Sequence, residues 1–248
     1  MNETPPRFLQ RIEAFHDLQP AERKALIDAC SRFSAFDAHR DILVEGHDGG
    51  SGCILEDGWA CRYRMLNDGR RQILNFLLPG DLIAGADRSA WPADHSVSTL
   101  TFCRVFHLDR GGLPELCRRY PRLQQIADWM VQRELSIVQE RIVDIGRRNA
   151  SERVGHLLLE LMFRLRPVGL CKDCEFELPL TQEMIADALG LSIVHVNRTL
   201  RRLDRNGLIA YTPGQVDILD EADLAALAEF DASYLHQGEA LARNGNAA

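Results

Sequence analysis

The chain has 248 residues, of which 46% are hydrophobic and 26% are charged, and its formal net charge at pH 7 is −7. This length allows one large domain or two ordinary ones, and the apolar fraction predicts a packed core and excludes wholesale disorder. The acidic balance argues against a whole surface that coats nucleic acid, but it allows a local basic patch. No apolar signal segment or membrane-length apolar run is visible, so the sequence predicts a soluble, cytoplasmic protein.

The N-terminal part of the chain changes from a helical to a β-type pattern. Leu18-Gln19-Pro20 predicts a turn into a short helix, with Leu26 and Ile27 on its buried side. From about Asp37 to Leu108, short β-prone runs are separated by Gly- and Asp-containing turns. Many short strands at regular spacing predict an antiparallel sandwich or barrel, and we expect residues 1–120 to form this domain together with the N-terminal helix.

Two local signals support this β domain. From Trp59 to Met65, every second residue is large or apolar, and this period predicts a half-buried strand. Asp68-Gly69 predicts a hairpin turn, because such turns require positive φ angles.

Residues 121–149 predict one long helix with two apolar stripes. Ile126, Met130 and Ile137 can pack on the β domain of the same chain. The other stripe recurs at alternating steps of four and three, the heptad spacing that faces a partner helix, at Val131, Leu135, Val138, Ile142 and Ile145. We therefore predict a parallel dimerisation helix, and a long core helix remains the alternative.

A smaller domain is predicted at residues 150–235, and residues 236–248 are expected to form a disordered tail. Ser151 is predicted to cap the first helix of this domain, which ends at Pro167 and Gly169. The final helix is expected to begin near Asp220 or Asp223.

The stretch from Leu180 to Ile209 has the pattern of a helix-turn-helix. Thr181 caps its first helix, Gly190 supplies the left-handed residue of the turn, and Ser192 caps its second helix. The second helix is expected to bury three apolar residues: Val196, Leu200 and Leu203.

The second helix carries an arginine-rich face that can enter the major groove of DNA. The predicted DNA-binding residues are Thr181, Ser192, Ile193, Val194, His195, Asn197, Arg198 and Arg201. An alternative is that the arginines only solvate a surface helix. The dimer helix upstream and a two-stranded wing from Leu208 to Ile218 favour DNA binding.

Three segments resemble the Crp/Fnr family of bacterial transcription regulators: "FLLPGDLIA" (76–84), "RRNASERVGHLLLEL" (147–161) and "LPLTQEMIADALGLSIVHVNRTLRRLDRNGLI" (178–209). The resemblance covers nearly the whole chain. It implies an α+β fold with an N-terminal antiparallel β-roll (a double-stranded jelly-roll), a long dimerisation helix and a C-terminal winged helix-turn-helix. It also implies a homodimer that binds a near-palindromic operator, responds to a small-molecule signal and has RNA polymerase as a further partner.

The recognition helix departs from the family pattern. Val194 stands where the best-known members often carry Glu, and it can touch a thymine methyl but cannot accept a hydrogen bond from cytosine. The resemblance carries Arg198 over as a base reader, to guanine, and places Asn197 at a position that also faces bases in relatives.

The effector-binding residues stay unknown, and no cofactor or metal is evident. Cyclic-nucleotide sensors of this family carry Gly-Glu-Leu and then Arg-Ser. Here Gly85 lies where Glu is expected and His95-Ser96 near where Arg-Ser is expected, while Arg88–Trp91 lies too close to the preceding turn. A cyclic phosphate would lack its counter-charge, so cyclic AMP is not expected. An iron–sulfur cluster needs four thiolates and is not expected either, because only Cys30 lies in the first 50 residues.

The seven cysteines do not predict a disulfide framework, since their number is odd and they are scattered along the chain. Cys171 and Cys174 form a lone CxxC pair, and a zinc site would need two more ligands at suitable spacing. We expect two free thiols here, and a redox switch is the alternative.

A cupin-like metal enzyme is the alternative from another class of function. Such a site needs a close His-x-His pair with a following Glu, but the sequence offers a single His47 between Glu45 and Glu56. No Ser-His-Asp arrangement, P-loop or dinucleotide motif is visible. The sequence therefore predicts a regulator and not an enzyme.

Overall fold

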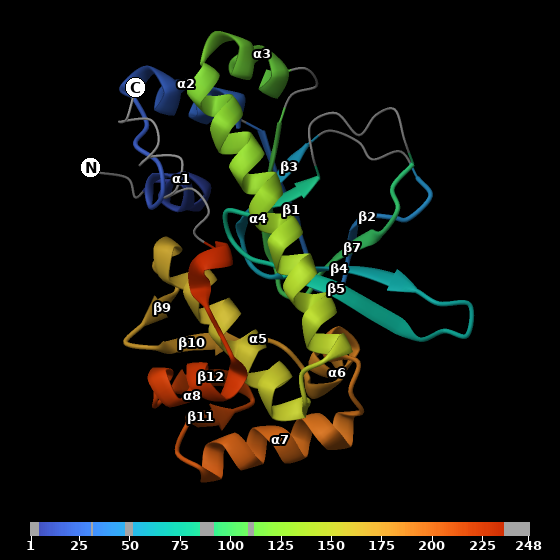
Figure 1. The fold of residues 1–248 in the computed structure, drawn as a ribbon. Helices are drawn as coiled ribbons and strands as arrows, with labels where there is room; N and C mark the ends of the chain where they lie inside the picture. The colour runs from blue at the N-terminus through green and yellow to red at the C-terminus, as the bar shows by residue number, and fades with distance from the viewer. Residues whose placement is uncertain (1–4, 31, 48–51, 85–91, 109–111, 236–248) are drawn as a thin grey trace. The chain divides into compact units, whose positions relative to one another are not determined.

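The computed structural model describes residues 5–30, 32–47, 52–84, 92–108 and 112–235 (Figure 1). Contacts divide the chain into two compact units. Among the described residues, the first comprises those within 5–63 and 76–134, and the second comprises residues 64–75 and those within 135–235. The predicted tail at 236–248 lies outside the described residues.

The first unit contains most of the β structure of the chain. The first eight strands of the described chain are β1 (Arg32–Phe36), β2 (Asp41–Leu43), β3 (Cys53–Asp57), β4 (Ala60–Met65), β5 (Arg71–Leu77), β6 (Leu82–Ala84), β7 (Ser96–Thr99) and β8 (Cys103–His107). Residues 64–75, which include the end of β4 and most of β5, are assigned to the second unit. The eight strands form two four-stranded sheets in the orders β1-β8-β3-β6 and β2-β7-β4-β5, whose pairings are antiparallel. The antiparallel β domain predicted from the sequence is thus confirmed.

Inward-facing side chains of both sheets form a shared core. Leu55, Val97, Cys103 and Val105 are fully buried in it. The predicted alternation from Trp59 to Met65 is wrong, because Trp59, Ala60 and Cys61 are all buried in succession, whereas Arg64 and Met65 at the other end are both exposed. Both faces of the strand are covered at its start and neither is buried at its end, so burial falls along the strand and does not alternate.

Helices flank the sheets of the first unit. They are α1 (Arg7–Glu13), α2 (Pro20–Ala29), α3 (Gly112–Arg119) and the first half of α4 (Pro121–Gly146). Helix α2 begins at the predicted turn, where Gln19 and Glu22 form a capping box. Leu26 is buried, but Ile27 is 37% exposed, so its predicted burial is wrong.

The second unit holds the C-terminal half of α4 and the rest of the chain. It contains α5 (Ala150–Leu165), η2 (Arg166–Val168), β9 (Cys171–Lys172), β10 (Glu175–Leu178), α6 (Gln182–Leu189), α7 (Ile193–Arg205), β11 (Ile209–Thr212), β12 (Gly214–Ile218), α8 (Glu221–Ala228) and η3 (Ala232–Leu235). The four short strands form one antiparallel sheet in the order β11-β12-β10-β9.

The junction between α4 and α5 differs from the prediction. Helix α4 ends at Gly146, and Asn149 caps α5 by accepting hydrogen bonds from the backbone N–H groups of Ser151 (2.9 Å) and Glu152 (3.3 Å). The Glu152 carboxylate accepts a hydrogen bond in return from the backbone N–H of Asn149 at 2.7 Å, which completes a capping box. The predicted cap, Ser151, is wrong because it lies inside the helix and is buried.

No helix in the described ranges combines the length and the apolarity needed to cross a membrane.

Candidate nucleic-acid interface

Helices α6 and α7 are joined by a short turn, and capping residues define where each helix begins and where α6 ends. The Thr181 hydroxyl accepts a hydrogen bond from the backbone N–H of Met184 at 3.2 Å, and the Ser192 hydroxyl accepts one from that of His195 at 3.3 Å. Gly190 ends α6 with a φ of +63°, in the left-handed region that favours glycine. Both predicted caps and the predicted turn glycine are confirmed.

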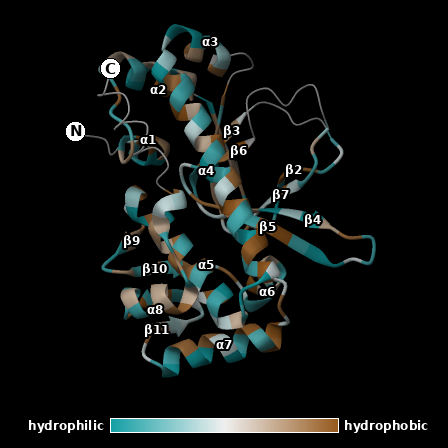
Figure 2. Ribbon diagram, viewed as in Figure 1, coloured by the Kyte–Doolittle hydropathy of each residue, from teal (hydrophilic) through white to brown (hydrophobic). Residues whose placement is uncertain are grey.

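Helix α7 has one apolar face and one charged face. Val196, Leu200 and Leu203 are at most 1% exposed, as predicted, and Thr199 joins them in the interior. The exposed side carries Ile193, Val194, His195, Arg198, Arg201, Arg202 and Arg205. In Figure 2 the helix is mostly teal, with hydrophobic colour near its start.

The arginines on this face are not neutralised by the protein. Within the described ranges, Arg198, Arg201 and Arg202 have no carboxylate at ion-pair distance. An exposed, unpaired guanidinium can bind a phosphate or the edge of guanine without first breaking an internal contact.

Asn197 lies half-buried between α7 and the start of α6. Its Nδ2 donates a hydrogen bond to Oε1 of Gln182 at 3.1 Å. Gln182 was not among the residues predicted for this site. The signal that the sequence offers for it is a side-chain amide at the first position of the helix before the recognition helix.

The strands after α7 form the predicted wing. β11 pairs with β12 so that Thr212 lies opposite Gln215, and Gly214 in the turn has a φ of +93°. β12 also pairs with β10, which ties the wing to the rest of the sheet.

One face of helix α4 exposes the predicted heptad seam. Val131, Leu135, Ile142 and Ile145 are 56%, 48%, 66% and 40% exposed. Val138 is half-buried. From the second stripe, Ile126 and Ile137 are buried, as expected for the side that packs on the same chain.

The opposite face of α4 buries a network of charges against α5. Arg141 lies 2.9 Å from Asp144 and 3.3 Å from Glu160, and Arg164 lies 2.8 Å from the same Glu160. All four side chains are at most 4% exposed. Arg148 bridges Asp144 and Glu140 at the edge of this network. The network therefore holds the C-terminal half of α4 against α5 in the domain that carries α7.

His156 lies inside the same network and is almost fully buried. Its Nε2 is 3.4 Å from Glu140 and its Nδ1 is 3.7 Å from Asp144. Burial lowers the pKa of His156 to about 3, with further lowering by Arg148 and Arg141, so the ring is neutral at pH 7. Burial also raises the pKa of Asp144 to about 6, against the opposing effect of Arg141.

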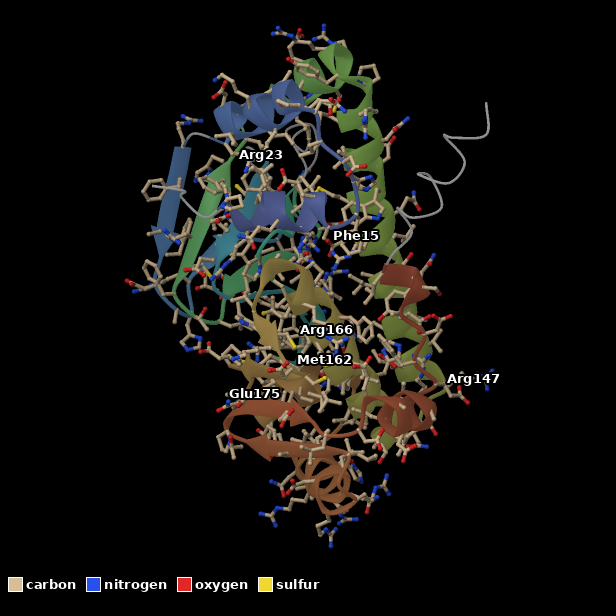
Figure 3. The ribbon with its side chains drawn as sticks, turned by 90° about the vertical axis from the view of Figure 1, so that its left-hand side faces the viewer. Phe15, Arg23, Arg147, Met162, Arg166 and Glu175 are labelled. Carbon is tan, nitrogen blue, oxygen red and sulfur yellow. The ribbon has the colours of Figure 1, made fainter. Side chains whose placement is uncertain are left out.

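The CxxC pair lies beside a different arginine. All seven cysteines are free thiols, and only Cys171 and Cys174 are not buried. Arg166 places its Nη2 3.2 Å from Sγ of Cys174, 3.5 Å from Sδ of Met162 and 2.5 Å from Glu221. Figure 3 shows Arg166 and Met162 next to each other at this end of α5. Burial raises the pKa of Cys171, and Arg166 acts in the opposite direction.

The positions considered for an effector are only partly described. Gly85 and Arg88–Trp91 lie outside the described residues. His95 is buried with its Nδ1 2.7 Å from Asp94, and Ser96 accepts a hydrogen bond from the backbone N–H of Glu45 at 3.0 Å. In the part of the chain that the structure describes, no three His, Cys, Asp or Glu side chains are grouped to hold a metal ion.

Comparison with known proteins agrees with this architecture. Residues 152–227 match a Crp-like helix-turn-helix domain, and residues 34–120 match a cyclic nucleotide-binding domain. The chain is 38% identical to the transcriptional activatory protein AadR of Rhodopseudomonas palustris, over 70% of this chain and 72% of that protein. It is 37% identical to the nitrogen fixation regulation protein FixK of Bradyrhizobium diazoefficiens, over 67% of this chain and 69% of that protein.

A solved structure shares the fold. The structure of FixK2 from Bradyrhizobium japonicum matches 81% of this chain and 98% of that chain, with a TM-score of 0.72 and 25% identity. The cupin-like enzyme alternative is therefore wrong, because the β domain belongs to a regulator. The chain belongs to the Crp/Fnr family and is a DNA-binding transcription regulator with a cyclic-nucleotide-binding-like domain and a Crp-like helix-turn-helix.

Proposed function

We propose that this regulator works as a homodimer that binds a near-palindromic operator by inserting α7 of each protomer into the major groove. The observation that carries the proposal is the unpaired, exposed arginine face of α7. A two-fold dimer presents two such helices to half-sites about one DNA turn apart.

In this proposal the side chains of α7 divide into two groups. Arg198 reads guanine through paired hydrogen bonds, and Val194, 67% exposed, touches a thymine methyl. Arg201 contacts phosphate, as do Thr181, Ser192 and His195 near the helix starts. Ile193, 49% exposed, adds apolar contact in the groove.

The seam on α4 joins the two protomers. Its exposed residues, Val131, Leu135, Ile142 and Ile145, bury their apolar surface only against a second helix, and Val138 lies between them. In this proposal α4, which ends at Gly146 and not at the expected residue 149, is the dimerisation helix between a sensor-like domain at 1–120 and the DNA-binding domain at 150–235. A signal received by the β domain reaches DNA by shifting this seam.

Relatives support two further partners. AadR is named as an activatory protein, which favours RNA polymerase as a partner of this chain at its promoters. The match to a cyclic nucleotide-binding domain favours a small-molecule effector without naming it. Both interactions belong to the cytoplasm, where bacterial DNA lies.

The test compares two aspartate substitutions on α4. Ile142→Asp places a charge in the seam, whereas Val143→Asp is the matched control, because Val143 is also exposed, at 42%, but lies off the seam. We expect Ile142→Asp to give monomers by light scattering and to lose binding to a selected operator duplex, while Val143→Asp stays dimeric and binds. If the wild-type chain is monomeric by light scattering and still binds the full operator, the proposal is contradicted.

The arrangement at Arg166 favours a second candidate function, a redox-responsive regulator. One guanidinium contacts the thiol of Cys174 and opposes the raised pKa of Cys171, and both thiols are partly exposed. With a small disulfide such as oxidised glutathione as the oxidant, two exchange steps would form the Cys171–Cys174 bond and release two glutathione thiols. Operator affinity that is equal in oxidised and reduced glutathione, for both the wild type and Cys171→Ser, would remove this function.

A further inference from the structure

We propose that Gln182 orients the side-chain amide of Asn197 and thereby makes Asn197 a reader of adenine. The inference rests on the proposed function, since it requires α7 to lie in the major groove. It adds a positioning residue on α6 and assigns a base to a position at which the Crp/Fnr resemblance assigns none.

The contact between the two amides fixes which atoms of Asn197 face outward. Gln182 presents its carbonyl oxygen to Asn197, and the Nδ2 group of Asn197 points toward α6. This uses one of the two Nδ2 hydrogens. The other hydrogen and the Oδ1 oxygen have no partner among the described residues.

The outward pair of atoms matches adenine and not guanine. Adenine offers an acceptor at N7 and a donor at N6 in the major groove, which the remaining N–H and Oδ1 of Asn197 can satisfy together. Guanine offers acceptors at both N7 and O6, so Oδ1 would face another acceptor. Rotating the Asn197 amide alone by half a turn would place Oδ1 against the carbonyl oxygen of Gln182, so the orientation of Gln182 favours the arrangement that matches adenine.

The surroundings of Asn197 allow this contact. Asn197 is half-buried, which limits its rotamers, and it is next to Arg198, which is exposed on the same helix. Side chains held in one geometry by neighbouring groups lose less conformational entropy on binding than freely rotating ones.

The alternative is that the hydrogen bond between Gln182 and Asn197 only stabilises the packing of α6 on α7. It would affect stability and overall DNA affinity, but it would not change which base is preferred. Base preference is therefore the readout, and three substitutions at position 182 give different expectations.

The experiment selects operators from a randomised duplex pool with the full-length protein. The base pair read by Asn197 is identified as the one at which Asn197→Ala loses selectivity. We expect wild type to prefer adenine there by about tenfold, and 7-deazaadenine, which lacks the N7 acceptor, to remove that preference.

The variants then test the role of Gln182. Gln182→Ala should relax the preference at this base pair alone. Gln182→Glu keeps an acceptor facing Asn197, so it should retain adenine while weakening binding to all sequences through its charge near the phosphates. Gln182→Lys offers only donors, so it should reverse the amide and favour guanine.

The outcomes are distinct. An unchanged adenine preference in both Gln182→Ala and Gln182→Lys overturns the inference, as does an unaltered affinity for 7-deazaadenine. Failure of wild type to enrich any sequence would instead overturn the proposed operator binding itself. Thermal unfolding of each variant, with the exposed Glu183→Ala as control, separates loss of folding from change of preference.

Discussion

Arginine has two opposite uses in the second unit. On α7, Arg198 and Arg201 are exposed and have no carboxylate partner in the described part of the chain. Between α4 and α5, Arg141 and Arg164 are almost completely buried and lie against Asp144 and Glu160. The first pair is available to an external anion, whereas the second holds two helices together.

This difference explains how a chain with a net charge of −7 can bind DNA. Net charge describes the sum over the molecule, but phosphates respond to charge within about 10 Å at ordinary ionic strength. The carboxylates of Asp144 and Glu160 pair with buried arginines and form no ion pair with Arg198 or Arg201 on α7. Substitutions in the two sets of arginines should therefore have separable effects, on folding in one case and on DNA binding in the other.

The largest effect is expected from the buried set. Arg141→Ala removes the arginine that contacts both Asp144 and Glu160, so that each buried carboxylate keeps one arginine partner, Arg148 or Arg164. Breaking this buried network should lower the free energy of unfolding by about 3–5 kcal/mol. Urea unfolding of the variant and the wild type measures this change in the free energy of unfolding. The control is Arg147→Ala, just after the end of α4, where the side chain is exposed and projects outward in Figure 3, so that an unchanged stability is expected. Equal losses in both variants would contradict the assignment.

Arg198→Ala should have the converse result: it should reduce operator binding and leave the stability of the fold unchanged. Loss of one guanine reader costs about 1–3 kcal/mol of discrimination in each half-site, enough to abolish specific operator binding in a dimer. Gel-shift titration on the selected operator measures the loss, and light scattering and thermal unfolding should match wild type. If the footprint on that operator persists, Arg198 does not read a base.

A smaller effect per pH unit is expected from acid, through His156. Its folded-state pKa of about 3 lies below the unfolded value of 6.5, so the folded chain binds fewer protons between these pH values. Stability from this group is therefore present above pH 6.5 and is lost as the pH falls toward 3, with a slope of at most about 1.4 kcal/mol per pH unit.

Asp144 acts in the opposite sense over part of this range. Its folded-state pKa, about 6, is raised above the ordinary 3.8, so its contribution to stability falls as the pH rises through that interval. Replacing His156 by Gln removes the larger of the two shifts. Urea unfolding at several acidic pH values should show a flatter loss for His156→Gln than for wild type, and parallel curves would refute the role of the ring.

The smallest effect is expected from a phosphate contact. Arg201→Ala should weaken binding to all sequences alike and reduce the slope of log affinity against log salt by about one for each phosphate that Arg201 neutralises. Fluorescence anisotropy at a series of salt concentrations measures this slope. A change in base preference would instead place Arg201 among the base readers.

Local signals made the DNA-binding unit predictable. Thr181, Gly190 and Ser192 define the two helices of the motif within a short stretch, and each residue has the role that its own chemistry predicts. Heptad spacing likewise separated the exposed stripe of α4 from the buried one. The family resemblance correctly gave the order of β domain, long helix and helix-turn-helix.

Contacts between residues far apart in sequence were not predictable in this way. Arg141 meets Glu160 across the junction of two helices, and Arg166 in η2 meets Glu221 at the start of α8. From the sequence alone, a buried arginine is assigned to the surface until its ion-pair partner is known. The cap of α5 was misassigned because Asn149 and Ser151 are both good caps, and only the backbone geometry distinguishes them.

The exposed seam on α4 has a consequence for gene control. If two chains must meet before either half-site is held firmly, the amount of bound operator at low expression rises with the square of the protein level. A modest increase in synthesis could then change promoter occupancy sharply, even before any signal arrives. The hydrophobicity of a few side chains along one helix would set that threshold, and small changes there could retune the response without touching the recognition helix.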